Sequence, residues 1–254
     1  MTASARHELD ADELTDLLLR LLTDEGYRTA LADRGARALA RDEAELVCLS
    51  TIDQEELDFT ARRFRSNLWN GDGGSGIAAG FPRSLPLLAE AGWPRERLLS
   101  AFLTSPAFEA YRALPHTGEG ISLEEAFARF ADGLTHGLAD GAGAEALRHT
   151  LEHELLRALL TALVHEHPVS FRSDVEGIRR TDNGYAAVRR HPAEVVAAWG
   201  VAVDGPGPVG CLYSSTARGL AFGKVSERVV TAVEHPDDPA SAQVLDALRI
   251  RGLW

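Results

Sequence analysis

One stretch of the sequence has the residue types and the spacing of a zinc site. His149, Glu152 and His153 form the pattern H-x-x-E-H, the inverted zinc-peptidase motif, within a segment whose leucines have helical spacing. Residues four positions apart lie on one face of a helix, so both imidazoles can bind the same metal ion. No companion motif supplies the third protein ligand that such a site needs, and leucines flank both histidines. We therefore expect these histidines to pack against other side chains, and we expect no metal and no cofactor.

Other patterns of catalytic residues are weaker. The serines lack the G-x-S-x-G context of a nucleophile elbow. Gly71-x-Gly73-x-x-Gly76 follows a predicted helix, whereas a dinucleotide site requires a strand at that point. Cys211 lies in a predicted strand, which is typical of a small core residue. With no triad and no pair of carboxylates, we expect that this chain alone is not an enzyme.

The N-terminal two thirds of the chain has the pattern of a helical protein. Leucine and phenylalanine residues recur at helical spacing, and the segment from Ser122 opens with a capping box that Glu125 completes. The expected helices are Asp12–Leu22, Tyr27–Ala40, Asp53–Trp69 with Asp53 as N-cap, Ser122–Leu138 and Ala144–His167. The sequence therefore predicts an all-α bundle over residues 1–167.

Beyond Pro168 the pattern changes to strands and short helices. Asn183-Gly184 lies between runs that contain β-branched or aromatic residues, which is a strong hairpin signal. The segment His191–Trp199 fits either a short helix or a strand. The other expected elements are the strands Pro208–Tyr213 and Gly219–Val225, joined by a turn at Ser214–Thr216, and the helices Ser226–Val233 and Ser241–Ile250. We predict a mainly α protein in which residues 168–254 form a small α+β, winged-helix-like domain.

Charge and hydropathy exclude several classes of protein. The formal net charge of −12 argues against a general nucleic-acid binder, because phosphates would be repelled. From His165 onward there are 10 basic and 11 acidic residues, against 16 and 27 before it, so the acidity lies in the first part. No apolar run approaches the ~20 residues that span a bilayer, and the N-terminus lacks the pattern of a signal peptide. We expect a cytoplasmic protein that binds no nucleic acid and no membrane.

Four motifs in the first half of the chain resemble one family. They are R-F-R-x-x-L at Arg63–Leu68, F-P-R-S-L-x-L-L at Phe81–Leu88, L-L-x-A-F-L-x-S-P-x-F at Leu98–Phe108 and G-I-S-L-E-E-A-F-x-R-F at Gly120–Phe130. In this order they resemble the partner subunits of multinuclear non-haem iron-dependent oxidases, the methanobactin-type systems that modify ribosomally made peptides. The resemblance implies that the iron is held by a separate barrel protein, with which this chain forms a heterodimer.

The resemblance also implies two binding surfaces. The stretch from Leu57 to Phe108 would help to form the contact with the oxidase, and the second domain would hold the leader of the precursor peptide. The residues assigned to the oxidase contact are Arg63, Arg65, Trp69, Phe81 and Arg83.

The residues around the predicted hairpin suit a peptide ligand. Arginines cluster there in an otherwise acidic protein, and guanidinium groups pair well with carboxylates, although a solvated face also explains them. A sheet edge among the predicted strands can accept an extended peptide as an added strand. The predicted peptide-binding residues are Arg179, Arg180, Arg189, Arg190, Cys211, Leu212 and Tyr213.

Two other functions stay open from the residues alone. A winged-helix regulator would place Arg189 and Arg190 near DNA. A zinc metallopeptidase would use His149, Glu152 and His153 in a cleft.

Overall fold

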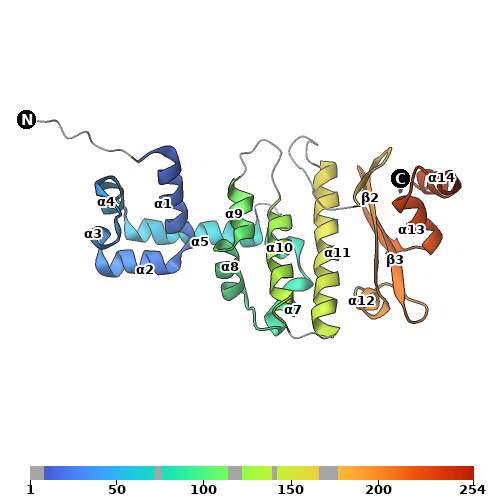
Figure 1. Ribbon diagram of the computed structural model, residues 1–254, viewed down its shortest axis with the longest axis horizontal. Helices are drawn as coiled ribbons and strands as arrows, with labels where there is room; N and C mark the ends of the chain where they lie inside the picture. Colours follow the sequence, from blue (N-terminus) through green and yellow to red (C-terminus); the bar gives the residue numbers. More distant parts are fainter. Residues whose placement is uncertain (1–8, 72–75, 114–121, 139–141, 166–176) are drawn as a thin grey trace, which may run out of the picture. The chain divides into compact units, whose positions relative to one another are not determined.

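The structure is a computed structural model that describes residues 9–71, 76–113, 122–138, 142–165 and 177–254 (Figure 1). The predicted mainly α class is confirmed, because most of the described residues are helical and the strands form one small antiparallel sheet. None of the described helices is both long and apolar enough to cross a membrane.

The chain forms two compact units, one of residues 1–76 and 95–105 and the other of residues 77–94 and 106–254. These units do not coincide with the two predicted domains. The predicted boundary at residues 167 and 168 lies outside the described residues, so that division stays a prediction.

All the secondary-structure elements among the described residues of the first unit are helices. Asp10, Asp24, Asp42 and Asp53 each cap a helix by accepting hydrogen bonds from backbone N–H groups of the first turn. The expected single helix Tyr27–Ala40 is in fact two, because the first ends at Gly35, whose φ of +76° a helix cannot contain. The helices are α1 Ala11–Thr23, α2 Glu25–Arg34, α3 Ala36–Leu39, α4 Glu43–Ser50, α5 Gln54–Asn70 and α8 Arg95–Leu103.

The second unit begins with helices that pack on a long central helix, α11, or, in the case of α9, on α10. Ser122 caps α10 as predicted, with its hydroxyl accepting from the N–H of Glu125. The buried Glu154 of α11 accepts from the backbone N–H groups of Arg83 and Ser84 at 2.7 and 2.9 Å, so it caps α7. These helices are α6 Ile77–Gly80, α7 Ser84–Glu90, α9 Pro106–Ala113, α10 Leu123–Thr135 and α11 Ala142–His165.

The sheet of the second unit is an antiparallel meander in the order β1-β2-β3-β4. The hairpin at Asn183-Gly184 is confirmed, because Arg180 pairs with Tyr185 across it. The expected turn at Ser214–Thr216 is wrong: these residues extend β3, and Thr216 pairs with Gly219 across a shorter turn. The elements are β1 Arg179–Arg180, β2 Gly184–Pro192, α12 Ala193–Ala198, β3 Pro208–Thr216, β4 Gly219–Lys224, α13 Glu227–Glu234, a 3₁₀ turn Pro239–Ser241 and α14 Ala242–Ile250.

Helices cover both faces of this sheet (Figure 1). Side chains of a strand point alternately to opposite faces, and here the alternation sorts them into two cores. Ala186, Val188 and Leu212 pack with α13, α14 and Trp254. Ala187, Cys211 and Tyr213 pack with α11 and α12. Each candidate site described below belongs to one of these two faces.

Candidate functional site

A cluster of histidines lies where α11 meets the sheet. The spacing within α11 places His149, Glu152 and His153 towards the sheet, and β2 contributes His191 from the facing side. Tyr213 of β3 lies between two of the rings. Its hydroxyl is 2.9 Å from Nδ1 of His153 and 3.0 Å from Nε2 of His191. The cluster therefore joins three elements that are far apart in the sequence.

Burial keeps the inner part of this cluster uncharged. His153, His191 and Tyr213 have almost no exposed surface. Burial lowers the pKa of both histidines to about 3. The charge of Arg157 lowers the pKa of His153 further, and the charge of His149 lowers that of His191 further. Burial also raises the pKa of Tyr213. A neutral hydroxyl has one proton, so Tyr213 donates to one ring and accepts from the other.

The outer part of the cluster reaches solvent. Nδ1 of His149 is 3.2 Å from Nδ1 of His191, and one oxygen of Glu152 is 3.9 Å from the same His191 nitrogen. The other oxygen of Glu152 accepts from Nε of Arg189 at 2.7 Å. The side chains of His149 and Glu152 are 26% and 39% exposed, so solutes can reach this side of the cluster. Two imidazoles and one carboxylate thus converge on one small space.

The two histidines of the H-x-x-E-H motif point to different partners in this arrangement. The expectation that its histidines pack against other side chains is correct for His153, whose ring stacks on Trp199 at a centroid distance of 4.1 Å. His149 points instead towards His191, which belongs to no motif of the sequence. A metallopeptidase would need His149 and His153 to share one ion. The contact between His149 and His191 cannot be read from a sequence motif, because the two residues are 42 positions apart. The alternation of side chains along β2 gives only the face of the sheet on which His191 lies, which is the α11 face.

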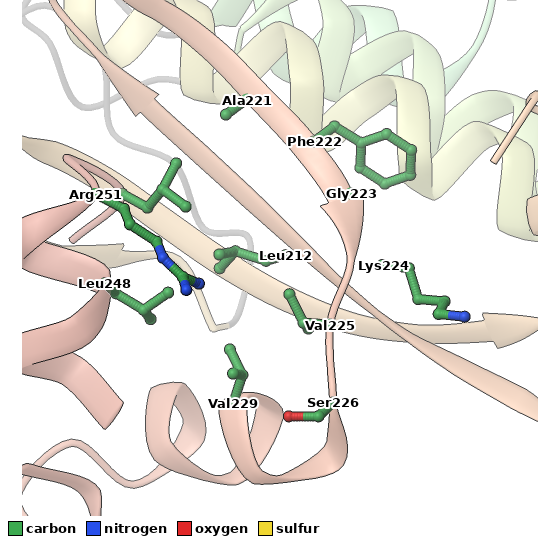
Figure 2. A pocket seen from close by; sticks show the side chains of 11 residues that line it. Leu212, Ala221, Phe222, Gly223, Lys224, Val225, Ser226, Val229, Leu248 and Arg251 are labelled. Carbon is green, nitrogen blue, oxygen red and sulfur yellow. The ribbon is translucent and has the colours of Figure 1, made fainter. Parts of the chain in front are cut away.

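A groove lies on the opposite face of the sheet, beside β4 (Figure 2). Its volume is about 430 Å³. In Figure 2 Leu212, Val225, Val229 and Leu248 point towards one space, and the guanidinium of Arg251 extends towards it as well. The full lining is Leu212, Ala221, Phe222, Gly223, Lys224, Val225, Ser226, Val229, Leu248, Arg251 and Leu253. The floor of the groove is therefore apolar, and Arg251 adds a cationic group to its walls, whereas Lys224 pairs with Asp204.

The predicted cluster of peptide-binding arginines is not one surface. Arg189 and Arg190 are neighbours in β2 and so point to opposite faces of the sheet. Arg189 bonds Glu152 of α11, whereas Arg190 forms ion pairs with Glu227 and Glu234 of α13. The exposed Arg179 donates to the carbonyl oxygen of Glu234 at 3.2 Å, and Arg180 is also exposed.

These contacts revise two of the earlier hypotheses. Arg189 and Arg190 already hold helices of their own chain, which weakens both the acidic-partner interpretation and the DNA-binding interpretation of these two residues. Cys211 and Tyr213 were also expected to contact peptide, but both side chains are fully buried. Leu212 is the predicted strand residue that lines the groove.

The residues assigned to the oxidase contact differ in exposure. Arg63 and Arg83 are exposed. Arg65 is half-buried and donates to the hydroxyl of Ser100 at 2.7 Å. Trp69 is buried, with the guanidinium of Arg95 over its ring at 5.1 Å.

Phe81 is a core residue, because it has no exposed surface and its ring lies 4.9 Å from that of Phe127. Arg63 and Arg83 are therefore the members of the predicted set whose side chains are most accessible to a partner protein.

The sequence matches no protein-family model and no curated protein. The functional assignment therefore depends on the geometry of these two sites and on the motifs of the first half of the chain.

Proposed function

We propose that this protein is a non-catalytic partner that binds an extended peptide along β4 and presents it to a separate iron-dependent oxidase. The observation that carries the proposal is the position of β4 at the edge of the described sheet, directly beside the apolar groove. The four motifs in the first half of the chain resemble oxidase partner subunits, and this resemblance implies that the peptide is the leader of a ribosomally made precursor.

The edge of β4 has the chemistry for strand addition. An edge strand presents unpaired backbone N–H and C=O groups to an incoming chain. The six residues of β4 span about 20 Å, which is the length of an ordinary strand. β3 is paired on both sides, so of the two strands β3 and β4 only β4 has an open edge in the described sheet. Backbone pairing along this edge would supply affinity for many different sequences.

The groove would supply the side-chain specificity. Every second side chain of an added strand would point to the α13 and α14 face, where Leu212, Val229 and Leu248 offer apolar contacts. Arg251 also lines the groove, and its charge favours acidic residues in the peptide, whereas Lys224 already pairs with Asp204 of the same chain. We therefore expect a ligand in which apolar and acidic residues accompany an extended backbone.

The remainder of the proposal comes from the resemblance. The oxidase would contact the first half of the chain, where Arg63 and Arg83 are accessible, and it would carry the iron and the catalytic groups. The two proteins would work together in the cytoplasm. The winged-helix-like character of residues 168–254 belongs to the same proposal, because a small antiparallel sheet with short helices after it is the form expected of a leader-recognition element.

Gly223 allows the groove to be closed without disturbing the sheet. A Cβ atom added to Gly223 would meet no atom within 4 Å, so a large side chain fits there and would occupy the groove. Gly133 in α10 also has open space around it and lies outside the groove, which makes Gly133→Trp a matched control.

The test is a selection of displayed random peptides on the immobilised full-length protein. We expect the selected peptides to bind the Gly223→Trp variant at least ~10-fold more weakly, because the indole fills the space that their side chains need. They should bind Gly133→Trp as tightly as the wild type. Selected peptides that bind the wild type and Gly223→Trp equally would place the peptide site elsewhere and overturn the proposal. Thermal unfolding of both variants would establish that each is folded.

A further inference from the structure

The three polar groups that converge between α11 and β2 have the dimensions of a metal site. One possible ligand atom from each of His149, Glu152 and His191 lies within 4.8 Å of the other two. Bonds of ~2.05 Å in a tetrahedral site place neighbouring ligand atoms about 3.3 Å apart. Nδ1 of His149 and Nδ1 of His191 are already 3.2 Å apart, and Oε2 of Glu152 is 3.9 Å from Nδ1 of His191. Small side-chain rotations would complete the geometry.

The surroundings of the cluster orient its ligand atoms. When His191 donates its Nε2–H to Tyr213 and Tyr213 donates to His153, a lone pair remains on Nδ1 of His191, facing His149 and Glu152. A hydrogen bond to the second ring nitrogen is the usual support of a metal-binding histidine. Arg189 bonds one oxygen of Glu152 and so fixes the carboxylate, leaving the other oxygen near the imidazoles.

We propose that His149, Glu152 and His191 bind a first-row divalent metal ion, with Zn²⁺ as the best match, and that this ion links α11 to β2. Two imidazole nitrogens and one carboxylate oxygen suit Zn²⁺ better than the oxygen-loving Ca²⁺ or Mg²⁺. The partial exposure of His149 and Glu152 leaves room for a water molecule as the fourth ligand. The site is independent of the peptide groove, because it lies on the opposite face of the sheet.

The positive charge of Arg189 sets the expected strength of this site. The guanidinium neutralises much of the carboxylate charge of Glu152, and this lowers the attraction for a cation. We therefore expect weaker binding than at a closed structural zinc site with thiolate ligands. Without metal, the two imidazoles hydrogen-bond to each other, and this contact is the alternative explanation of their proximity.

The test is to titrate the full-length, chelator-stripped protein with ZnCl₂ and to measure binding by calorimetry. Metal analysis of the protein after gel filtration then gives the number of ions bound per chain. We expect one Zn²⁺ per chain and a raised unfolding temperature in its presence. His149→Gln and Glu152→Gln should each lower the affinity at least ~10-fold. Both side chains are partly exposed, so these variants should fold even if substitution of the buried His191 does not.

His136→Gln is the matched control, because His136 is an exposed histidine at the end of α10, away from the cluster. It should bind Zn²⁺ like the wild type. Co²⁺ in place of Zn²⁺ should give the visible spectrum of a site with nitrogen and oxygen ligands in the wild type and lose it in His149→Gln. Absence of stoichiometric binding, or equal binding by the wild type and His149→Gln, would overturn the proposal in favour of a hydrogen-bonded histidine pair.

Discussion

At the scale of single residues, a glycine sets how closely two strands of the sheet approach. Gly184 begins β2 and pairs with Thr216 of β3. A Cβ atom added to it would lie 1.9 Å from the backbone oxygen of Ser215. A backbone atom in a paired strand cannot move aside as the end of a flexible side chain can. Gly184 therefore serves the packing of β2 on β3 as well as the turn that the Asn-Gly pair predicts.

The substitution Gly184→Ala should consequently destabilise the fold by at least ~2 kcal/mol, since the strands must separate to admit the methyl group. Urea unfolding of the two proteins would measure this loss. Gly133→Ala provides a control of opposite sign: this exposed helical glycine has open space around it, and alanine there should stabilise by about 0.5–1 kcal/mol. A Gly184→Ala variant as stable as the wild type would contradict the close approach of the strands.

At the scale of the elements, Arg190 attaches α13 to the sheet. Its guanidinium forms ion pairs with Glu227 at one end of α13 and with Glu234 at the other. The hydrogen bond from Arg190 is the main reason that the pKa of Glu234 is lowered. A carboxyl group with a lowered pKa in the folded state stabilises the fold above its ordinary pKa. This contribution is lost as the pH falls through the folded-state value.

Arg190→Gln should therefore lower the free energy of unfolding at neutral pH by up to ~1 kcal/mol, a modest effect because both partners are partly exposed. The difference from the wild type should be smaller in acid than at neutral pH, because it shrinks as the pH falls through the lowered pKa of Glu234. Unfolding in urea at neutral and at acidic pH measures this difference in stability. Arg180→Gln, in the exposed strand β1, is the control. A loss of equal size at both pH values would mean that Arg190 acts through packing alone.

The elements that could be predicted from the sequence are those with local signals. Asp53 and Ser122 cap helices through hydrogen bonds to residues two or three positions away, so the pattern of a few residues is sufficient. The Asn183-Gly184 hairpin is similarly local. The break at Gly35 was missed because a glycine within a helical pattern is often tolerated, and only its positive φ ends α2.

The candidate sites could not be predicted in the same way because they depend on distant pairings. His149 meets His191 across 42 positions, and the contact requires both the orientation of α11 and the register of β2. The missing third ligand was one reason for expecting no metal at the H-x-x-E-H motif, and the flanking leucines were another. The strand alternation that directs Arg189 and Arg190 to opposite faces was available from the sequence, but only once the strand itself was established.

At the scale of the whole molecule, the proposal requires a second protein. The chain has a candidate surface for the peptide, whereas the iron and the reaction would belong to the oxidase. Partner contacts that involve arginines depend on acidic residues opposite them, because guanidinium groups bind carboxylates with matched geometry. Arg63 and Arg83 are the accessible cations of the predicted contact.

We expect this chain to co-elute with its partner oxidase, of the iron-dependent class that the resemblance implies, as one heterodimer in gel filtration. Arg63→Glu combined with Arg83→Glu should shift the pair towards two separate peaks, since like charges placed opposite one another cost several kcal/mol in an interface. Arg37→Glu, at an exposed position outside the four motifs, is the control and should leave the complex intact. Two separate peaks from the wild-type proteins would contradict the partner assignment.

Alternate side chains of β2 face α11 and α13, and this alternation limits where residues can be inserted into the chain or deleted from it. Adding or deleting one residue within the strand would exchange the faces of every residue beyond that point, so Arg189 would turn towards α13 and Arg190 towards α11. An insertion would bury the guanidinium of Arg190 where His191 now lies, and an insertion or a deletion would remove the His191 imidazole from His149. Insertions and deletions in this strand of related proteins should therefore occur in steps of two residues, or be accompanied by a bulge that restores the alternation.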